Sequence, residues 1–320
     1  MPIQDELQRA VKAALADAEC VIGWGAGPQA LRHRPLFMKN EAEADAFAAG
    51  FLSVNNLALF LPEYKGRKVA VVVKGCDARS VTQLINENLV RREDVKIIAF
   101  PCRGVIDPDK AAALLEGVCE AGEVTALLED GEDIVLATPA GDRRFAKKDV
   151  LADKCGRCRY PNALDADVFV GEKLEPVIAD DDYADLAALE ALPFEERMAF
   201  WEKEMSRCIR CYACRNACPL CVCRDQCVAV SRDPHWVTQS DGVRDKLFFQ
   251  IIHASHLAGR CTGCGECQRA CPVGIPVLLL KRALSRQVET LFAYQAGVDQ
   301  GTPPLLTFSL DEPKIKERDW

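Results

Sequence analysis

The stretch RCIRCYACRNACPLCVCRDQC, residues 207–227, places seven cysteines in twenty-one positions, and the structure that we predict for the surrounding region depends on it. The whole chain holds seventeen cysteines in 320 residues, an odd number. The N-terminus lacks an apolar run fit for a signal peptide, and no segment offers the roughly 18 continuous apolar residues of a membrane span. We therefore expect a cytoplasmic chain with reduced thiols, in which metal binding is favoured over disulfides.

One motif, C-x2-C-x2-C-x3-C-P, occurs twice and indicates iron. In bacterial ferredoxins, three cysteines of such a run bind one 4Fe-4S cluster and the fourth binds the other cluster. Structural zinc usually uses C-x2-C pairs instead, so the spacing favours iron over zinc. Glycines in the second run, CTGCGEC, let backbone amides approach the sulfurs. The predicted ligands are Cys208, Cys211, Cys214 and Cys271 for one cluster, and Cys261, Cys264, Cys267 and Cys218 for the other.

Charge is distributed unevenly along the chain. The net charge of -8 excludes a broad nucleic-acid-binding surface. Residues 201–290 nevertheless contain thirteen Lys and Arg against eight Asp and Glu, a local +5, which leaves -13 for the rest. Clusters with four thiolates are anions, so basic side chains near them could offset their charge and tune their potential. The candidates are Arg207, Arg210, Arg215, Arg224 and Arg269, and a solvated face is the alternative for any one of them.

The N-terminal part alternates strand-like and helix-like segments. Residues 69–73 and 95–100 are apolar runs typical of buried strands, and residues 80–90 between them have a helical pattern. This order predicts a βαβ unit with two parallel neighbouring strands. Cys76 and Cys102 each follow the carboxyl end of a strand. We therefore expect both on one edge of the sheet, where such folds bind ligands.

Helical periodicity follows in the part that contains both runs, with Pro193 near a helix start. We predict an α/β domain with a parallel sheet at 1–175, a linker at 176–200, an all-α dicluster ferredoxin domain at 201–297 and an extended tail at 298–320. One apolar stripe ends at Gly259, and another lies between Pro276 and Gly297. The stripes consist of Val243, Leu247, Phe248, Ile251 and Ile252, and of Val277, Leu280, Leu284, Val288 and Leu291.

A third centre is indicated by Cys155 and Cys158, a C-x2-C pair in DKCGRCRYPNALDADVFVGE. With KGCDARSV and FPCRGV, this stretch resembles the beta-subunit family of deazaflavin-reducing hydrogenases and deazaflavin-dependent formate dehydrogenases. The resemblance covers about residues 65–175, and related beta subunits carry a fused dicluster region like that at 207–271. It implies a 4Fe-4S cluster on Cys76, Cys102, Cys155 and Cys158. The alternative is two buried core cysteines and an unrelated thiol pair.

Five cysteines remain after these assignments. Cys221, Cys223 and Cys227 could hold a further cluster with one more ligand, or they could be buried or reduced thiols near a cluster, and both interpretations stay open. Cys20 and Cys119 are most simply core residues.

Two other patterns carry less weight. The glycines of VIGWGAGP, at 23, 25 and 27, favour a tight turn over phosphate or flavin contact, because the motif is not G-x-G-x-x-G. His253 and His256 share a helical face, and ordinary core or surface histidines are favoured over ligands.

These observations predict an electron relay inside a larger soluble oxidoreductase complex, because clusters exchange single electrons and no nicotinamide site is evident. The resemblance implies a flavin, molybdenum or tungsten catalytic subunit on one side and a heterodisulfide-reductase-type acceptor on the other. Donors would be NADH, formate, hydrogen or reduced deazaflavin. The alternatives are a subunit that binds FAD and itself oxidises a hydride carrier, and a zinc-binding interaction module without redox function.

Overall fold

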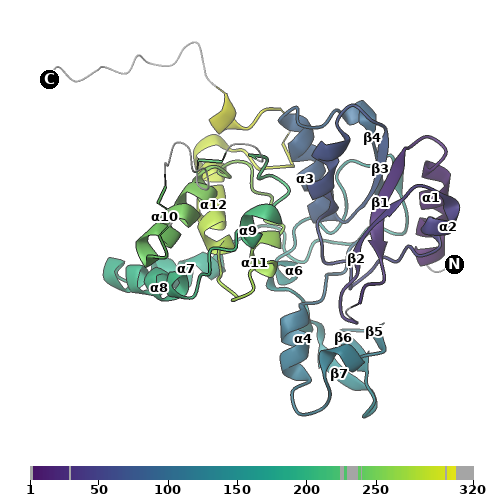
Figure 1. Cartoon of the computed structure of the whole chain (residues 1–320), viewed down its shortest axis with the longest axis horizontal. Helices are drawn as coiled ribbons and strands as arrows, with labels where there is room; N and C mark the ends of the chain where they lie inside the picture. The colour runs from purple at the N-terminus through teal and green to yellow at the C-terminus, as the bar shows by residue number, and fades with distance from the viewer. Residues whose placement is uncertain are drawn as a thin grey trace.

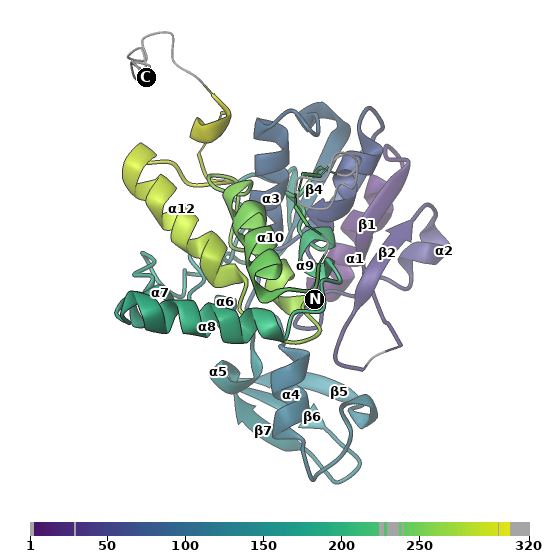
Figure 2. The same cartoon turned by 60° about the vertical axis from the view of Figure 1, so that its left-hand side comes forward.

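The computed structural model describes residues 3–28, 30–223, 227–228, 237–238, 240–299 and 301–307. An α/β part formed by N-terminal residues lies beside a helical part that contains both cysteine runs (Figure 1). A small unit formed by residues 108–150 projects below the two (Figure 2). Most of the predicted tail, from residue 308 on, lies outside the described residues.

The predicted parallel pairing is confirmed. Strands β3 (Val69–Val73) and β4 (Val95–Ala99) are parallel neighbours. They belong to a five-stranded sheet of order β2-β1-β3-β4-β8, in which β1 (Cys20–Gly25) and β8 (Val168–Phe169) are also parallel to their neighbours. The edge strand β2 (Arg34–Met38) runs antiparallel to β1. The sheet is therefore mixed, and the prediction of an entirely parallel sheet was wrong at this edge.

Helix α3 (Gly75–Asn86) connects β3 to β4 and completes the predicted βαβ unit. It begins five residues earlier than predicted, so Cys76 lies in its first turn, at the carboxyl end of β3. Figure 1 shows α3 on one side of the sheet and α1 (Ile3–Ala14) on the other. All of β3 is buried between these layers, which explains its uninterrupted apolar sequence. The short elements here are α2 (Glu41–Ala44), η1 (Leu57–Tyr64) and η2 (Arg92–Asp94).

The prediction of a tight turn was wrong for Gly23 and Gly25, because both lie within strand β1. A β-carbon on Gly23 would lie 2.9 Å from the side chains of Met38 and Phe47, and one on Gly25 would lie 2.8 Å from the backbone oxygen of Ala46. These glycines therefore permit close packing on the strand.

The small unit contains an antiparallel sheet that the sequence analysis did not predict. Its short strands have order β5-β6-β7. Half-buried residues alternate with exposed ones in β5 and with buried ones in β6, so the apolar alternation typical of a strand is weak in the sequence. Ile134 and Leu136 of the central strand are buried in a separate core. The elements are α4 (Pro108–Leu114), η3 (Ala121–Glu123), β5 (Ala126–Asp130), β6 (Asp133–Ala137), β7 (Arg143–Ala146) and α5 (Lys147–Val150).

Helices surround the cysteine runs. The start of α8 directly after Pro193 confirms that prediction, and α8 and α12 both pack against α10. Part of the predicted linker is helical as α7, which packs on α12. The elements are α6 (Asp153–Gly156), α7 (Ala184–Glu190), α8 (Phe194–Ser206), α9 (Ala213–Asn216), α10 (Val243–Ser255), α11 (Glu266–Arg269), α12 (Leu278–Phe292) and η4 (Pro304–Leu306).

Helix α10 buries a different face from the predicted apolar stripe. Phe248 and Ile251 are 51% and 45% exposed, whereas Gln250 and His253 are buried. The buried face meets the cysteine runs, and the Gln250 amide donates a hydrogen bond to the Cys214 sulfur at 3.5 Å. Because the buried residues of α10 include Lys246, Gln250 and His253, apolar periodicity could not identify the buried face.

Polar contacts join α3 to the helical part. Arg260, directly before the second run, forms a forked ion pair with Glu87, with a shortest distance of 2.6 Å. The hydroxyl oxygens of Ser80 and Thr262 lie 2.9 Å apart in the interior. These contacts fix the second run against the α/β part.

Replacing Glu87 with glutamine is expected to lower the free energy of unfolding by about 2 kcal/mol, because charge-assisted hydrogen bonds are lost and the Arg260 guanidinium stays buried. Chemical denaturation followed by circular dichroism measures this change. Glu93, whose side chain is 69% exposed, provides the matched control Glu93→Gln, expected to stay within about 0.5 kcal/mol. A Glu87→Gln variant as stable as this control contradicts the anchoring role.

Candidate metal centres

The two cysteine runs adopt the same backbone turn. In the second run, Gly263 and Gly265 have φ angles of 68° and 76°. At the corresponding positions of the first run, Arg210 and Tyr212 have φ angles of 51° and 58°. This left-handed conformation costs a residue with a β-carbon about 1–2 kcal/mol. The first run thus keeps the shape of the second against the intrinsic preference of its residues. The third cysteines lie on α9 and α11.

Backbone amides approach the sulfurs in both runs. The Gly263 amide donates to the Cys261 sulfur at 3.4 Å, as expected from the glycines of this run. The Arg210 amide donates to the Cys208 sulfur at the same distance, and the Cys271 sulfur accepts from the Ile275 amide. Such hydrogen bonds stabilise negative charge on sulfur.

The fourth cysteine of each run lies with the other run. Cys218 interacts electrostatically with Cys264, Cys267 and Cys261. Cys214 has Cys208 and Cys271 as neighbours, and these three line one small cavity with Cys211. We call Cys208, Cys211, Cys214 and Cys271 the first-run site, and Cys261, Cys264, Cys267 and Cys218 the second-run site.

The two sites differ in access to solvent. Cys211 of the first-run site is exposed, and the adjacent Ile209 is 62% exposed. In the second-run site, Cys218, Cys264 and Cys267 are all buried. The first-run site therefore reaches the molecular surface, while the second-run site lies inside.

Cys76, Cys102, Cys155 and Cys158, which we call the N-terminal site, line one cavity of about 280 Å³. The Cys102 amide donates to the Pro161 carbonyl oxygen at 2.9 Å, and the Val105 amide donates to the Cys155 sulfur at 3.4 Å. These bonds join the end of β4 to the C-x2-C segment. The same cavity is also lined by Cys261, so the N-terminal site adjoins the second-run site.

The thiols of these sites fit iron-sulfur clusters. Burial raises the pKa of the Cys102 thiol to about 12, and the neighbouring Cys155 adds to the rise. Burial and the neighbouring Cys264 raise the pKa of Cys218 well above its ordinary value. Thiolates gathered in this way need nearby positive charge, which the irons of a cluster supply. Among the described residues, no three His, Cys, Asp or Glu side chains converge on a position for a single metal ion.

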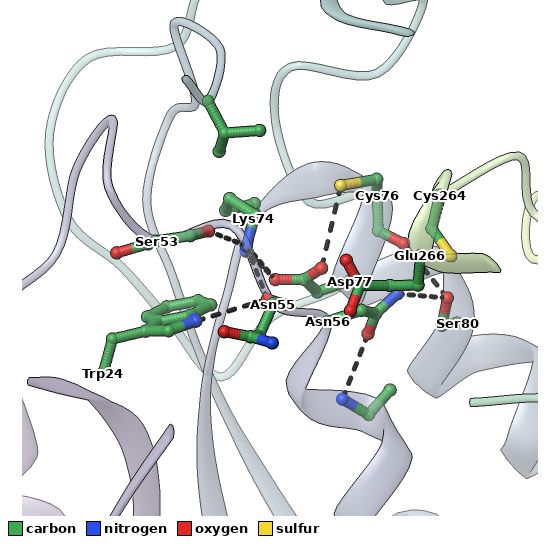
Figure 3. Close-up of polar contacts among 12 residues, drawn as sticks. Trp24, Ser53, Asn55, Asn56, Lys74, Cys76, Asp77, Ser80, Cys264 and Glu266 are labelled. Carbon is green, nitrogen blue, oxygen red and sulfur yellow. Dashed lines mark hydrogen bonds and ion pairs between the residues drawn. The ribbon is translucent and has the colours of Figure 1, made fainter. Parts of the chain in front are cut away.

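A buried ion pair holds the first turn of α3, which carries Cys76. Lys74 and Asp77 are both 1% exposed and 2.8 Å apart. The Lys74 ammonium also donates to the carbonyl oxygens of Ser53 and Asn55, and it lies 4.1 Å from the centre of the Trp24 ring. Figure 3 shows this network, with Cys264 and Glu266 of the second run at the right. The position of Cys76 is therefore fixed from both the sheet and the helix.

The chain is similar to several known proteins. Residues 204–275 match the family model of the 4Fe-4S dicluster domain. The chain is 26% identical over 326 residues to an F420-dependent formate dehydrogenase subunit beta of Methanocaldococcus jannaschii, covering 85% of each chain. It is 24% identical over 298 residues to the corresponding subunit of formate dehydrogenase 1 of Methanococcus maripaludis, covering 75% of each. The resemblance to the beta-subunit family is confirmed.

The beta-subunit resemblance and the dicluster domain identify the chain as an iron-sulfur protein of the electron-transfer type. A chain of the F420-reducing [NiFe] hydrogenase complex from Methanosarcina barkeri also matches, with 17% identity and a TM-score of 0.38. That match covers 48% of this chain and 62% of the other. None of the described helices is both long and apolar enough to span a membrane.

Five cysteines of this chain lie outside the three sites. Cys221 interacts electrostatically with Cys223 and Cys227, so these three gather near one another. Cys20 is fully buried in the sheet core, and Cys119 packs, half-buried, against the core of the small unit. Cys20 is therefore the core residue predicted, whereas Cys119 lies at the margin of a core. All seventeen cysteines are described, and none forms a disulfide.

Among the described residues, no hydrogen bond joins His253 or His256 to a cysteine sulfur. His253 is buried, and its Nδ1 lies 3.5 Å from the Lys281 ammonium. Burial and the charge of Lys281 lower the pKa of His253 to about 2, so the ring is neutral. His256 follows the last turn of α10 and is exposed.

Several charged residues beside the sulfurs were missed by the sequence analysis. Lys154 and Arg79 line the cavity of the N-terminal site, and Lys281 of α12 is 2% exposed among the cysteines. Lysines in an amphipathic pattern are expected on the solvent side, so no local signal marks them. Of the arginines predicted to offset cluster charge, Arg224 lies outside the described residues. Arg269 pairs with Glu266 at 2.8 Å, and Arg215 lies near Cys221.

Proposed function

We propose that this chain relays single electrons through three 4Fe-4S clusters held at the N-terminal, second-run and first-run sites. The observation that carries the proposal is the neighbourhood of the fourth cysteines, since Cys218 interacts with sulfurs of the second run and Cys271 with Cys214 of the first. When bound, such clusters each accept or donate one electron. The polypeptide supplies four thiolates at each site and several amide hydrogen bonds to the sulfurs, and it keeps the second-run site from water.

The proposal includes the division of the chain. An α/β domain at 1–175 carries the N-terminal site, and a linker at 176–200 leads to an all-α dicluster domain at 201–297. An extended tail at 298–320 completes the chain. For Cys221, Cys223 and Cys227 both interpretations stay open: they bind a further cluster with one more ligand, or they are buried or reduced thiols near a cluster.

The order of the sites follows from their contacts. The N-terminal site shares a cavity with Cys261, and Cys214 of the first-run site is a neighbour of Cys267. The second-run site thus lies between the other two. The exposed Cys211 makes the first-run site the exchange point with a partner subunit.

The proposal extends to the partners of the chain. We propose a cytoplasmic multi-subunit redox complex that links a flavoprotein, formate dehydrogenase or hydrogenase to a heterodisulfide-reductase-like acceptor. The names of the formate dehydrogenase beta subunits support this class of complex. In this role the chain has no independent active site.

Anaerobically purified protein is expected to contain about twelve irons and about twelve acid-labile sulfides per chain, four of each for every cluster. Metal and sulfide analysis of the purified chain provides the measurement. An additional four of each would support a further cluster at Cys221, Cys223 and Cys227. Zinc with little iron would establish the interaction-module alternative and end the relay proposal.

The cavity of the N-terminal site favours one second candidate. It extends beyond the four cysteines to Tyr160, Tyr183 and Tyr294 and to Arg159 and Arg282, so aromatic and cationic side chains line it together. Such a lining suits FAD, in a subunit that itself oxidises NADH or reduced deazaflavin and passes single electrons to the clusters. A flavin absorption band released on denaturation would support this candidate, and an iron-only spectrum would support the relay.

A further inference from the structure

Lys154 lies between the N-terminal and second-run sites. Its ammonium donates a hydrogen bond to the carbonyl oxygen of Cys264. Its alkyl chain packs on the second run, since a β-carbon on Gly265 would lie 3.0 Å from the Lys154 Cδ. The same ammonium interacts electrostatically with Cys76 and Cys155 of the N-terminal site. One cation therefore faces sulfurs from both sites.

Lys281 occupies the corresponding position between the second-run and first-run sites. It is 2% exposed, and its strongest electrostatic partners are Cys267, Cys218 and Cys261 of the second-run site, followed by Cys214 of the first-run site. Among the described residues, the polar atom nearest to its ammonium is Nδ1 of the neutral His253 ring, at 3.5 Å. No carboxylate pairs with Lys281 among the described residues. Its charge is thus directed at the sulfurs.

We propose that Lys154 and Lys281 each raise the reduction potentials of the two clusters that flank them. This inference rests on the proposed function, because it assigns clusters to the three sites. A four-thiolate cluster becomes more negative when it accepts an electron, so a fixed positive charge nearby stabilises the reduced form. The second-run site, which both lysines face, receives the larger total effect.

Replacing each lysine is expected to change the reduction potentials of a different pair of clusters. Lys154→Met, which keeps most of the side-chain volume, is expected to lower the potentials of the N-terminal and second-run clusters and leave the first-run cluster unchanged. Lys281→Met is expected to lower the potentials of the second-run and first-run clusters and leave the N-terminal cluster unchanged. For the affected clusters we expect at least a tenfold change in the ratio of reduced to oxidised form, about 59 mV for one electron.

Redox titration of the full chain monitored by electron paramagnetic resonance measures these shifts, with signals assigned through Cys→Ser variants of each site. Lys148→Met removes the same charge from an exposed position and is the matched control, expected to shift no signal. Lys154→Arg keeps the charge and is expected to restore the potentials lowered by Lys154→Met. A purely structural role for the lysine would not give this rescue.

The possible outcomes distinguish a failure of the proposed function from a failure of the lysine assignment. Wild-type protein with far fewer than about twelve irons contradicts the proposed function itself. Fully loaded variants with unchanged potentials, or with equal shifts of all three signals, overturn only the assignment of the lysines. A second substitution, Lys154→Gln or Lys281→Gln, tests whether loss of a cluster is specific to methionine. If both the Met and the Gln variant of a lysine lose a cluster, that lysine acts in assembly, and its assignment to the potential is likewise overturned.

Discussion

Replacing Cys218 with serine is expected to remove the cluster of the second-run site and to spare that of the first-run site, although Cys218 belongs to the first run in sequence. The reason is its position beside Cys264, Cys267 and Cys261. Iron content should fall from about twelve to about eight per chain, because a buried hydroxyl replaces one thiolate ligand. Iron analysis and electron paramagnetic resonance of the reduced protein measure the loss.

Cys271→Ser is the reciprocal variant, and it is expected to remove the first-run cluster alone. Cys20→Ser changes the same atoms at a core position away from the sites and is the control for thiol loss, expected to keep all irons. If Cys218→Ser and Cys214→Ser abolish the same signal, ligation follows the order of the sequence, and the exchanged arrangement is wrong.

Replacing Gly75 with alanine is expected to remove the cluster of the N-terminal site. A β-carbon there would lie 1.9 Å from the carbonyl oxygen of Tyr160 and 2.9 Å from that of Asn162. Both atoms belong to the backbone and cannot move aside alone. The first turn of α3 must therefore separate from the C-x2-C segment, which takes Cys76 away from Cys155 and Cys158. Overpacking of this kind also destabilises the fold, by about 1–3 kcal/mol or more.

Iron analysis and thermal unfolding of Gly75→Ala measure both effects, with an expected loss of about four irons per chain. Gly156 lies in the same C-x2-C segment, but a β-carbon there would meet no atom within 4 Å. Gly156→Ala is therefore the matched control and should retain about twelve irons and the wild-type unfolding temperature. A Gly75→Ala protein indistinguishable from this control contradicts the close contact as the basis of the N-terminal site.

Local pattern was sufficient for several elements. The run VAVVV predicts the buried strand β3, and its pairing with β4 follows from the helix between them, since a right-handed βαβ connection returns a parallel strand. Pro193 marks the start of α8 because proline cannot continue a preceding helix. The antiparallel edge strand β2 and the sheet of the small unit were missed because their half-buried residues give weak periodicity.

The spacing of the two C-x2-C-x2-C-x3-C-P runs was enough to predict which eight cysteines gather into two sites, because it limits which sulfurs can reach a common centre. Three features became visible only in the folded chain: the buried face of α10, the closeness of the three sites, and the positions of Lys154 and Lys281 between them. Those features depend on the packing of segments far apart in the chain. A lysine that lies between two groups of cysteines acquires these neighbours only when that packing has formed. No local sequence pattern therefore predicts its position.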